Sequence, residues 1–511
     1  MNKDKKKFLI NLFGNIIVFL TQVLINFLLV PFISTQIGDE AVGFTSLATN
    51  IINYGTIITA ALNGMAGRFI TVAYHKKKFE DSNQYFVSVL IMNILFSSIL
   101  TILVYIFVIN IQYLLNISPE LVSDVRLTFI FVCINMCILL IDNAFSVATF
   151  IKNRLELSAI KFIIANIIKV ITILLLFKYL PAKMFYQGLA TIFSSIIIIC
   201  FDIIYTKKLI PEIKISIKDF RKKKIIEILK EGIWNSVTKV SEILLTGIDL
   251  LIANIMVGAH EMGLLAIAKT VPQAVVSLTS AIASAFYPKC AYYYSTGNKD
   301  LLVKCFKKTI SMETIIILVP MVGLIFFGME FYSLWLPEKK MDEIKIIQIL
   351  SILTLIYTLG NGLVEGLYYA NTLTKKIKNS VLITMGIGIL STVLVFIALK
   401  FTNYGVYAIA AVSSVLMLFR ALIITPIYCS NVLKIKWNYF FSELSKSLIC
   451  LIIIFITFYF MTKNLHIYNW ISFIVNVGIA GLIGYIEVFI VYSKDILKKF
   501  FIKEVQNEKQ N

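Results

Sequence analysis

The stretch that decides the fold occurs twice: residues 37–48 read IGDEAVGFTSLA, and residues 257–268 read VGAHEMGLLAIA. Gly38 and Gly43 recur as Gly258 and Gly263, 220 residues later in each case. Each copy closes a short turn and opens a new apolar segment. This recurrence predicts two copies of one larger structural unit, and chance recurrence of turn glycines is the alternative.

The composition around these copies is that of a membrane protein. Of the 511 residues, 59% are hydrophobic and 15% are charged, whereas soluble domains carry about 25% charged residues. Apolar stretches of about 20 residues, the length that crosses a bilayer, recur along the chain. The sequence predicts an all-α polytopic membrane protein with about fourteen transmembrane helices. The predicted spans are 8–33, 41–71, 83–114, 124–150, 158–180, 185–206, 226–257, 262–288, 306–331, 343–371, 379–400, 404–430, 439–462 and 467–492.

The charge distribution predicts the orientation. The net charge is +19, and Lys and Arg gather in alternate connections, which the positive-inside rule assigns to the cytoplasm. We therefore expect a multi-pass protein of the cell (cytoplasmic) membrane with both termini in the cytoplasm and no nucleic-acid partner. The apolar run 8–33 is too long for a secretory signal, so we expect a retained first span. The seven cysteines offer no external pair, so a disulfide framework is not expected.

The repeat also predicts the domain organisation. Six spans separate the two copies, so both halves cross the membrane in the same sense, as in transporters with parallel repeats. We expect two six-helix lobes related by a pseudo-two-fold axis, followed by an appended helix pair. The predicted parts are the N-terminal lobe (1–206), a basic cytoplasmic linker (207–225), the C-terminal lobe (226–430), the appended transmembrane pair (431–492) and a cytoplasmic tail (493–511). The basic linker is read as a positive-inside connection, with attraction to anionic lipid headgroups as the alternative.

Polar residues inside the predicted spans indicate where function lies. Residues 235–249 read NSVTKVSEILLTGID, and on a continuous helix the five polar positions of this segment would fall within about 80° of one another. Further polar stripes occur on the first, second and eighth spans. Because polar side chains are costly in lipid, we expect four such stripes to line a hydrated cavity between the lobes. Interhelical hydrogen bonding without a transport role is the alternative.

Candidate site residues follow from these stripes. Lysines suit a phosphate group, and intramembrane carboxylates suit coupling to H⁺ or Na⁺, between which the sequence does not choose. Lys239 and Glu242, three residues apart, could instead neutralise each other. The predicted cavity residues are Lys239, Lys269, Arg68, Asn53, Gln273, Asn15 and Gln22, and the ion-coupling candidates are Asp249, Glu242 and Asp142.

Enzyme chemistry finds no matching motif. His75, His260 and His466 lie in three different connections and lack metal-ligand spacing. No phosphate-binding loop of the GxxxxGK[ST] kind occurs. We therefore expect no catalytic residues, no resident metal and no cofactor.

The chain resembles the lipid-linked oligosaccharide flippases of the multidrug/oligosaccharidyl-lipid/polysaccharide exporter superfamily. One matching block covers 13–48 and continues with NGMAGRFI at 63–70; a second covers 248–273 and 285–302. The family features are an Asp in the seventh span, a Gly-x4-Gly turn, and a Pro before a loop that ends in a GNK-like turn. Here these are Asp249, Gly258 with Gly263, Pro288 and Gly297-Asn298-Lys299.

The resemblance implies a flippase, and not an enzyme, that works by alternating access in polysaccharide biosynthesis. It would move an undecaprenyl-diphosphate-linked glycan, or a teichoic-acid or capsule precursor, across the membrane, as a monomer in contact with polysaccharide polymerase or assembly machinery. Lys239, Lys269 and Arg68 would contact the diphosphate, and residues 439–492 would border the lipid groove. The carboxylates of Glu242 and Asp249 make the seventh span mixed in charge, which leaves room for a zwitterionic or amino-sugar headgroup.

Two alternatives stay open. A cation-coupled multidrug or small-molecule exporter (an antiporter) of the same superfamily usually has twelve spans, so the appended pair favours the flippase. A membrane enzyme of glycan assembly is disfavoured because the external connections are short.

Overall fold

The computed structural model describes residues 20–21, 23–152, 154–463 and 467–508. These residues form helices and short connections, and none of them lies in a strand. Helices are expected because lipid offers no hydrogen-bond partner to the backbone, and a helix satisfies its own N–H and C=O groups. The predicted all-α membrane fold is therefore confirmed.

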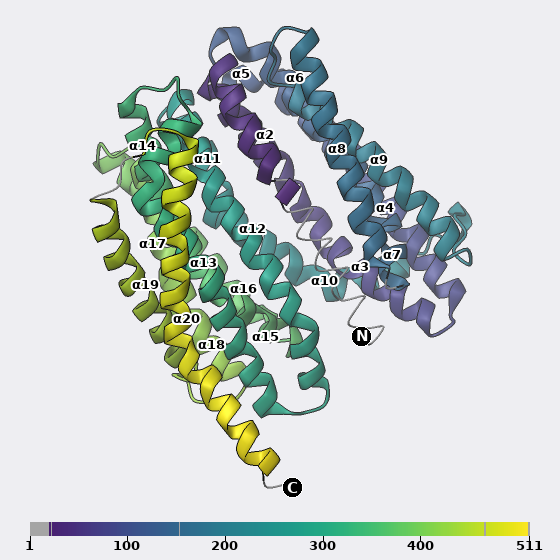
Figure 1. Ribbon diagram of the computed structural model, residues 1–511. Helices are drawn as coiled ribbons and strands as arrows, with labels where there is room; N and C mark the ends of the chain where they lie inside the picture. The colour runs from purple at the N-terminus through teal and green to yellow at the C-terminus, as the bar shows by residue number, and fades with distance from the viewer. Residues whose placement is uncertain (1–19, 22, 153, 464–466, 509–511) are drawn as a thin grey trace. The chain divides into compact units, whose positions relative to one another are not determined.

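The helices follow one another with short turns (Figure 1). The first part contains the apolar helix Val23–Gln36, α2 (Asp39–Tyr54), α3 (Thr56–His75), α4 (Phe79–Ile109), α5 (Ile111–Leu114), η1 (Pro119–Leu121), α6 (Val122–Phe145), α7 (Val147–Ile151), α8 (Leu155–Tyr179) and α9 (Tyr186–Leu209). The middle part contains η2 (Ile217–Asp219), α10 (Lys222–Glu242), η3 (Ile243–Gly247), α11 (Asp249–Met256) and α12 (Ala259–Ser295). The last part contains α13 (Lys299–Trp335), α14 (Met341–Val364), η4 (Glu365–Leu367), α15 (Tyr368–Leu373), α16 (Ile377–Phe401), α17 (Val406–Phe419), η5 (Arg420–Ile424), α18 (Thr425–Val432), α19 (Phe441–Thr462) and α20 (Trp470–Glu508).

Twelve segments among the described residues are long and apolar enough to cross a membrane. They correspond to the predicted spans other than the first and the seventh. Half of the first falls outside the described residues, and most of the other half lies in the apolar helix Val23–Gln36. The seventh is helical from Lys222 to Met256, but a π-helical segment interrupts it and its first half is rich in charged residues. The count of fourteen thus stays a prediction.

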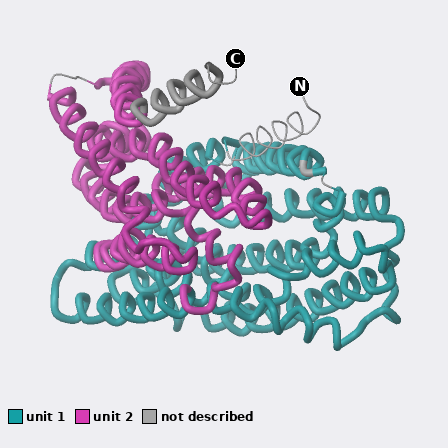
Figure 2. Tube along the Cα trace, turned by 90° about the horizontal axis from the view of Figure 1, so that it is seen from below, with its two compact units in different colours: residues 1–267, 381–409 teal, residues 268–380, 410–511 magenta. Residues whose placement is uncertain are grey.

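The chain forms two compact units that differ from the predicted lobes (Figure 2). Unit 1 contains residues 1–267 and 381–409, and unit 2 contains residues 268–380 and 410–511. The seventh span therefore belongs to the same unit as the first six helical segments. The predicted division at residue 206 remains a prediction about symmetry, whereas these units are defined by packing.

In unit 1 the basic linker packs against the ends of α3 and α4. Ile210 and Ile213 are buried in an apolar cluster with residues of α3, α4 and α10. Asn83 donates to Asp219 at 2.5 Å and accepts from the backbone N–H of Lys214 at 2.9 Å. The linker is therefore packed against the ends of these helices.

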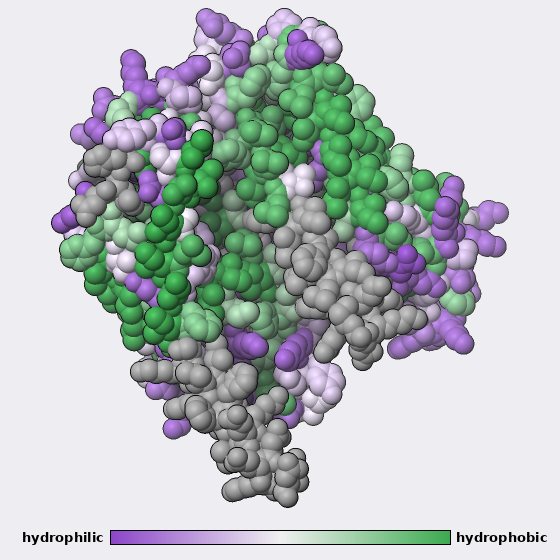
Figure 3. Space-filling view, in the orientation of Figure 1, coloured by the Kyte–Doolittle hydropathy of each residue, from purple (hydrophilic) through white to green (hydrophobic). Residues whose placement is uncertain are grey.

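In unit 2 the appended helices α19 and α20 pack on α13. Leu318, Val322, Ile454 and Phe458 are buried in one apolar cluster at this contact. The outer faces of α19 and α20 are hydrophobic, and Ile471 is 75% exposed. Hydrophobic side chains likewise cover α20 and α8 on the face drawn in Figure 3. Such surfaces suit contact with lipid tails.

Candidate functional site

The seventh span is broken where the sequence predicts a continuous polar stripe. The π-helical segment η3 separates α10 from α11. A π turn closes its hydrogen bonds one residue later than an α turn, so residues beyond it rotate relative to residues before it. Lys239 and Glu242 are exposed, while Asp249 is buried. The prediction of one uniform stripe is therefore wrong, and π segments of this kind occur frequently at functional sites.

Lys239 and Glu242 form an ion pair on the exposed face of α10. Lys239 Nζ lies 2.7 Å from Glu242 Oε2, and the two side chains are 45% and 55% exposed. The mutual neutralisation that their spacing allowed is therefore present in this structure. A pair this exposed contributes little to stability. The ammonium group of Lys239 can therefore exchange Glu242 for a ligand at little cost.

Asp249 lies beside the point where the second and seventh spans touch. The Tyr54 hydroxyl at the end of α2 donates to the Gly247 carbonyl at 2.7 Å. Asp249, 5% exposed, is close enough to act electrostatically on Tyr54. This coupling candidate is thus placed at the break in the helix, beside the end of α2.

The two helices α3 and α10 approach each other so closely that only small residues fit. A Cβ atom at Gly232 would overlap the Ala61 carbonyl oxygen. Ser236 inserts its hydroxyl into the α3 backbone, donating to the Ile57 carbonyl at 2.5 Å and accepting from the Ala61 N–H at 3.1 Å. These contacts fix the register between segments about 170 residues apart.

Arg68, a predicted cavity residue, belongs to this same interface. Its Nη1 lies 3.3 Å from Glu231 Oε2, and both side chains are more than half exposed. Asn53, at the end of α2, is exposed, and its carbonyl accepts from the Thr56 hydroxyl at 2.6 Å. Two exposed ion pairs therefore lie on α3 and α10 of unit 1, and the exposed Asn53 lies near the end of α2.

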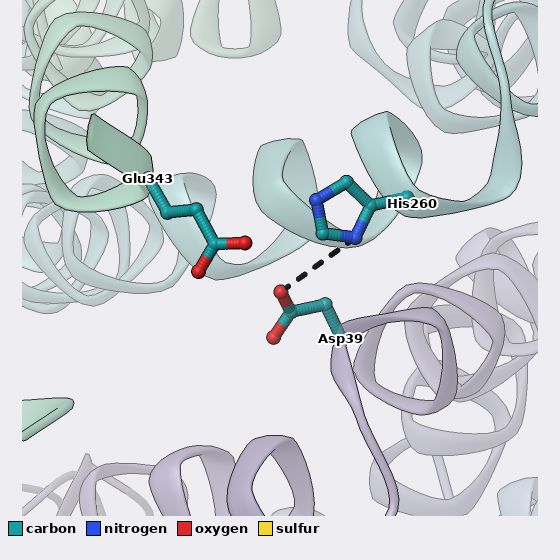
Figure 4. Close-up of side chains that lie close together, drawn as sticks. All are labelled: Asp39, His260 and Glu343. Atoms are coloured by element: carbon teal, nitrogen blue, oxygen red, sulfur yellow. Dashed lines mark ion pairs between the residues drawn. The ribbon is translucent and has the colours of Figure 1, made fainter. Parts of the chain in front are cut away.

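The two copies of the repeated turn meet within unit 1. A Cβ atom at Gly43 would lie 3.0 Å from the Gly263 Cα, and one at Gly263 would lie 2.5 Å from the Asp39 carbonyl oxygen. His260 Nδ1 lies 3.9 Å from Asp39 Oδ2, the pair joined by the dashed line in Figure 4. Both glycines are therefore required by close backbone packing. Glu343, also drawn in Figure 4, belongs to α14 of unit 2. Its Oε2 atom lies 3.6 Å from Nζ of Lys339, just before that helix.

The remaining predicted residues are placed as follows. Lys269 and Gln273 lie on the part of α12 that belongs to unit 2, where Lys269 is half-buried and Gln273 exposed. Asn15 and Gln22 lie outside the described residues. Their predicted role in a cavity remains a prediction.

Asp142 is buried in a cluster that the sequence analysis did not identify. Lys161 of α8 forms an ion pair with Asp202 of α9, and the Asp142 carboxyl on α6 lies beside both. Each of these residues stands near one end of its own span. Of these three residues, only Asp142 is predicted from the sequence, as an ion-coupling candidate, because the register that joins three helices has no sequence signal.

Comparisons with known proteins agree with this architecture. A model of the family described as polysaccharide biosynthesis protein matches residues 7–292. The membrane protein EpsK of Bacillus subtilis (strain 168), named as uncharacterized, is 28% identical over 434 residues, which is 85% of each chain.

Solved structures show the same fold at low sequence identity. A multidrug resistance MATE family transporter of the MOP superfamily, in an inward-facing conformation, matches with a TM-score of 0.64 and 15% identity, over 83% of this chain and 99% of that one. The lipid II flippase MurJ, in an inward closed conformation, matches with a TM-score of 0.62 and 17% identity, over 92% of this chain and 100% of that one. At this level of identity the two matches show the fold alone. Because the family model matches more than half of the residues, this multi-pass membrane protein belongs to the polysaccharide biosynthesis protein family.

Proposed function

We propose that the protein is a flippase that moves a lipid-linked oligosaccharide, or a teichoic-acid or capsule precursor, across the cytoplasmic membrane by alternating access. The observation that carries this proposal is the exposed charge on predicted spans 2 and 7 of a polysaccharide biosynthesis family member. Charged side chains within spans mark the paths of polar substrates.

A diphosphate-linked glycan fits these groups. Lys239 and Arg68 each offer a cation whose present partner is an exposed carboxylate, Glu242 and Glu231 respectively. A diphosphate accepts charge-assisted hydrogen bonds from such groups and can replace a carboxylate partner. The displaced carboxylates of Glu242 and Glu231 could then form ion pairs with an amino group on the sugar. Lys269, Asn53 and Gln273 are the further residues that we assign to substrate binding.

The lipid tail is accommodated differently from the headgroup. The appended helices α19 and α20 are hydrophobic on their exposed faces and are anchored to α13 on the other. A polyprenyl chain prefers such a surface to a hydrated cavity. We assign residues 439–492 as the border of the lipid path.

Further parts of the proposal concern partners and energy. The substrate carrier would be undecaprenyl diphosphate, the protein would act as a monomer beside polysaccharide polymerase or assembly machinery, and both termini would lie in the cytoplasm. Transport would be coupled to H⁺ or Na⁺ through Asp249, Glu242 or Asp142, without a bound cofactor.

Depletion of the protein in its own cells tests the proposal. A flippase predicts that lipid-linked glycan accumulates in the cytoplasmic leaflet and that surface polymer is lost. Unchanged surface polymer with raised sensitivity to dyes or drugs would overturn the flippase and favour the small-molecule exporter.

A further inference from the structure

Three ionisable side chains from three helices of unit 1, none of them a predicted cavity residue, lie together. Asp142 of α6, Lys161 of α8 and Asp202 of α9 are 6%, 1% and 0% exposed. Helix α9 packs against both α6 and α8, and Figure 1 shows α8 and α9 running side by side. The three residues, named here the buried triad, therefore share one site inside the helix bundle.

The contacts of the buried triad are unequal. Lys161 Nζ donates to Asp202 Oδ2 in a buried ion pair. The Asp142 carboxyl lies close enough to Asp202 and Lys161 to interact with both. Among the described residues, the Oδ1 atoms of Asp142 and Asp202 are buried and have no hydrogen-bond partner. The Oδ1 atoms of Asp142 and Asp202 can thus each take part in a further hydrogen bond.

Charge counting decides what completes the site. With all three groups ionised, two negative charges face one positive charge inside a low-dielectric bundle, and an uncompensated buried charge is costly. Two carboxylates that share a site cannot both ionise easily, and one proton held between them removes the repulsion. A bound metal cation would instead stand beside the Lys161 ammonium and be repelled by it. The triad therefore suits a proton.

The neighbouring groups do not supply the missing positive charge. On Asp142, the charged groups that act are Asp202 from α9 and Lys161 from α8. Toward the end of α9, Asp202 and Arg154 both act electrostatically on Tyr205, and Arg154 is itself paired with Glu156. The charge balance of the triad is thus set within the triad.

We propose that Asp142, Lys161 and Asp202 form a proton-binding site that holds one proton between the two carboxyl groups while the lysine stays charged. The carboxyl of Asp142 donates this proton to an oxygen of Asp202, whose second oxygen accepts from Lys161. If the protein transports as proposed above, this site is where a coupling proton is held, and that last statement rests on the proposed function. Proton binding itself does not depend on it.

A second ion pair on α6 serves as a control that distinguishes the buried triad from an ordinary ion pair. Asp124 at the start of α6 is buried and lies 3.3 Å from Lys183 Nζ. This pair contains one carboxylate and one ammonium, so its charges balance without a proton. Asp124→Asn is therefore the control for substitutions in the triad.

Infrared spectroscopy of the purified full-length protein at neutral pH tests the proposal, because a protonated carboxyl group absorbs apart from ionised carboxylates. We expect a protonated-carboxyl band in the wild type and a weaker band in Asp142→Asn and in Asp202→Asn, since each variant leaves one carboxylate balanced by Lys161. Lys161→Met should strengthen the band, because both carboxyl groups are then protonated. Asp124→Asn should leave it unchanged.

The proposal is overturned if the wild type and Asp142→Asn have the same band intensity, or if added Na⁺ abolishes the band. Should Asp142→Asn fail to fold, Asp142→Glu keeps the carboxyl group and should shift the band frequency; an unshifted band in the folded variant also overturns the proposal. These spectra need no transport, so a failure of the flippase assignment leaves their outcome interpretable.

Discussion

Gly232 on α10 lies directly against the backbone carbonyl of Ala61 on α3, whose oxygen occupies the position that a Cβ atom of residue 232 would need. The contact joins the seventh span to the second, with the Ser236 hydroxyl bonded to the same α3 turn. A substrate path between spans 2 and 7 would require this interface to open. Its strength is therefore relevant to both stability and transport.

Gly232→Ala should lower the thermal unfolding midpoint, since overpacking of a well-packed contact costs about 1–3 kcal/mol. The matched control is Gly386→Ala in α16, where no atom lies within 4 Å of the added Cβ. That variant should be neutral or slightly stabilised, because alanine favours a helix by up to about 1 kcal/mol over glycine. Thermal unfolding of both purified variants decides, and equal midpoints would contradict the described contact.

Asn254→Leu should destabilise unit 1 by about 1–3 kcal/mol, because it removes two hydrogen bonds to the Asn116 backbone, each worth about 0.5–1.5 kcal/mol. Asn254 is fully buried, accepts from the Asn116 backbone N–H at 3.0 Å and donates to the Asn116 carbonyl at 3.0 Å. The control is Asn110→Leu, at an exposed amide that bonds only within its own turn among the interactions of the described residues. Thermal unfolding measures the difference, and a wild-type midpoint in Asn254→Leu would refute the hydrogen-bond assignment.

The packing of the basic linker against α3 should become less stable at acid pH. The Tyr74 hydroxyl donates to Glu212 at 2.7 Å, and this hydrogen bond lowers the pKa of Glu212 below its ordinary value. A lowered pKa contributes stability above the ordinary glutamate range, and that stability is lost as the pH falls through the lowered pKa. Because Glu212 is exposed, the effect should stay below about 1 kcal/mol.

Hydrogen exchange of linker residues 210–221, followed across acid pH, measures this effect. Protection in the wild type should decline as Glu212 is protonated, and Tyr74→Phe should remove most of that pH dependence. The same decline in both proteins would show that Glu212 does not hold the linker.

Lys239→Ala should reduce transport about tenfold, since one charge-assisted hydrogen bond is worth about 1.5–3 kcal/mol. The single variant also leaves Glu242 without its partner, so Lys239→Ala/Glu242→Gln is the necessary companion. If Lys239 binds the substrate, the double variant is as defective as the single one. Recovery of wild-type transport in the double variant would show that Lys239 serves only to balance Glu242.

Much of the fold could be predicted from the sequence because the bilayer imposes it. Twelve of the predicted spans appear as helices long enough to cross, since length and apolar composition alone select such segments. The pairing of Lys239 with Glu242 could also be anticipated, because three-residue spacing brings side chains together on one helix. Local geometry is readable from local sequence.

The remaining features depend on register between distant helices. The π segment Ile243–Gly247 alters the faces of α11, and hydrophobic periodicity gives no sign of it. Arg68 meets Glu231, and Lys161 meets Asp202, because α3 packs on α10 and α8 on α9. Such contacts follow from tertiary packing, so the sequence shows the charged residues but not their partners.

The central claim is tested most directly with liposomes that contain the purified protein and lipid-linked glycan extracted from cells depleted of it. Such cells should accumulate the native substrate, and enzymatic labelling of externally exposed sugar measures its movement between leaflets. The account predicts that the wild-type protein equilibrates the glycan between leaflets and that Lys239→Ala/Glu242→Gln does so about tenfold more slowly. Glycan that stays in its original leaflet, as in protein-free liposomes, would contradict the account.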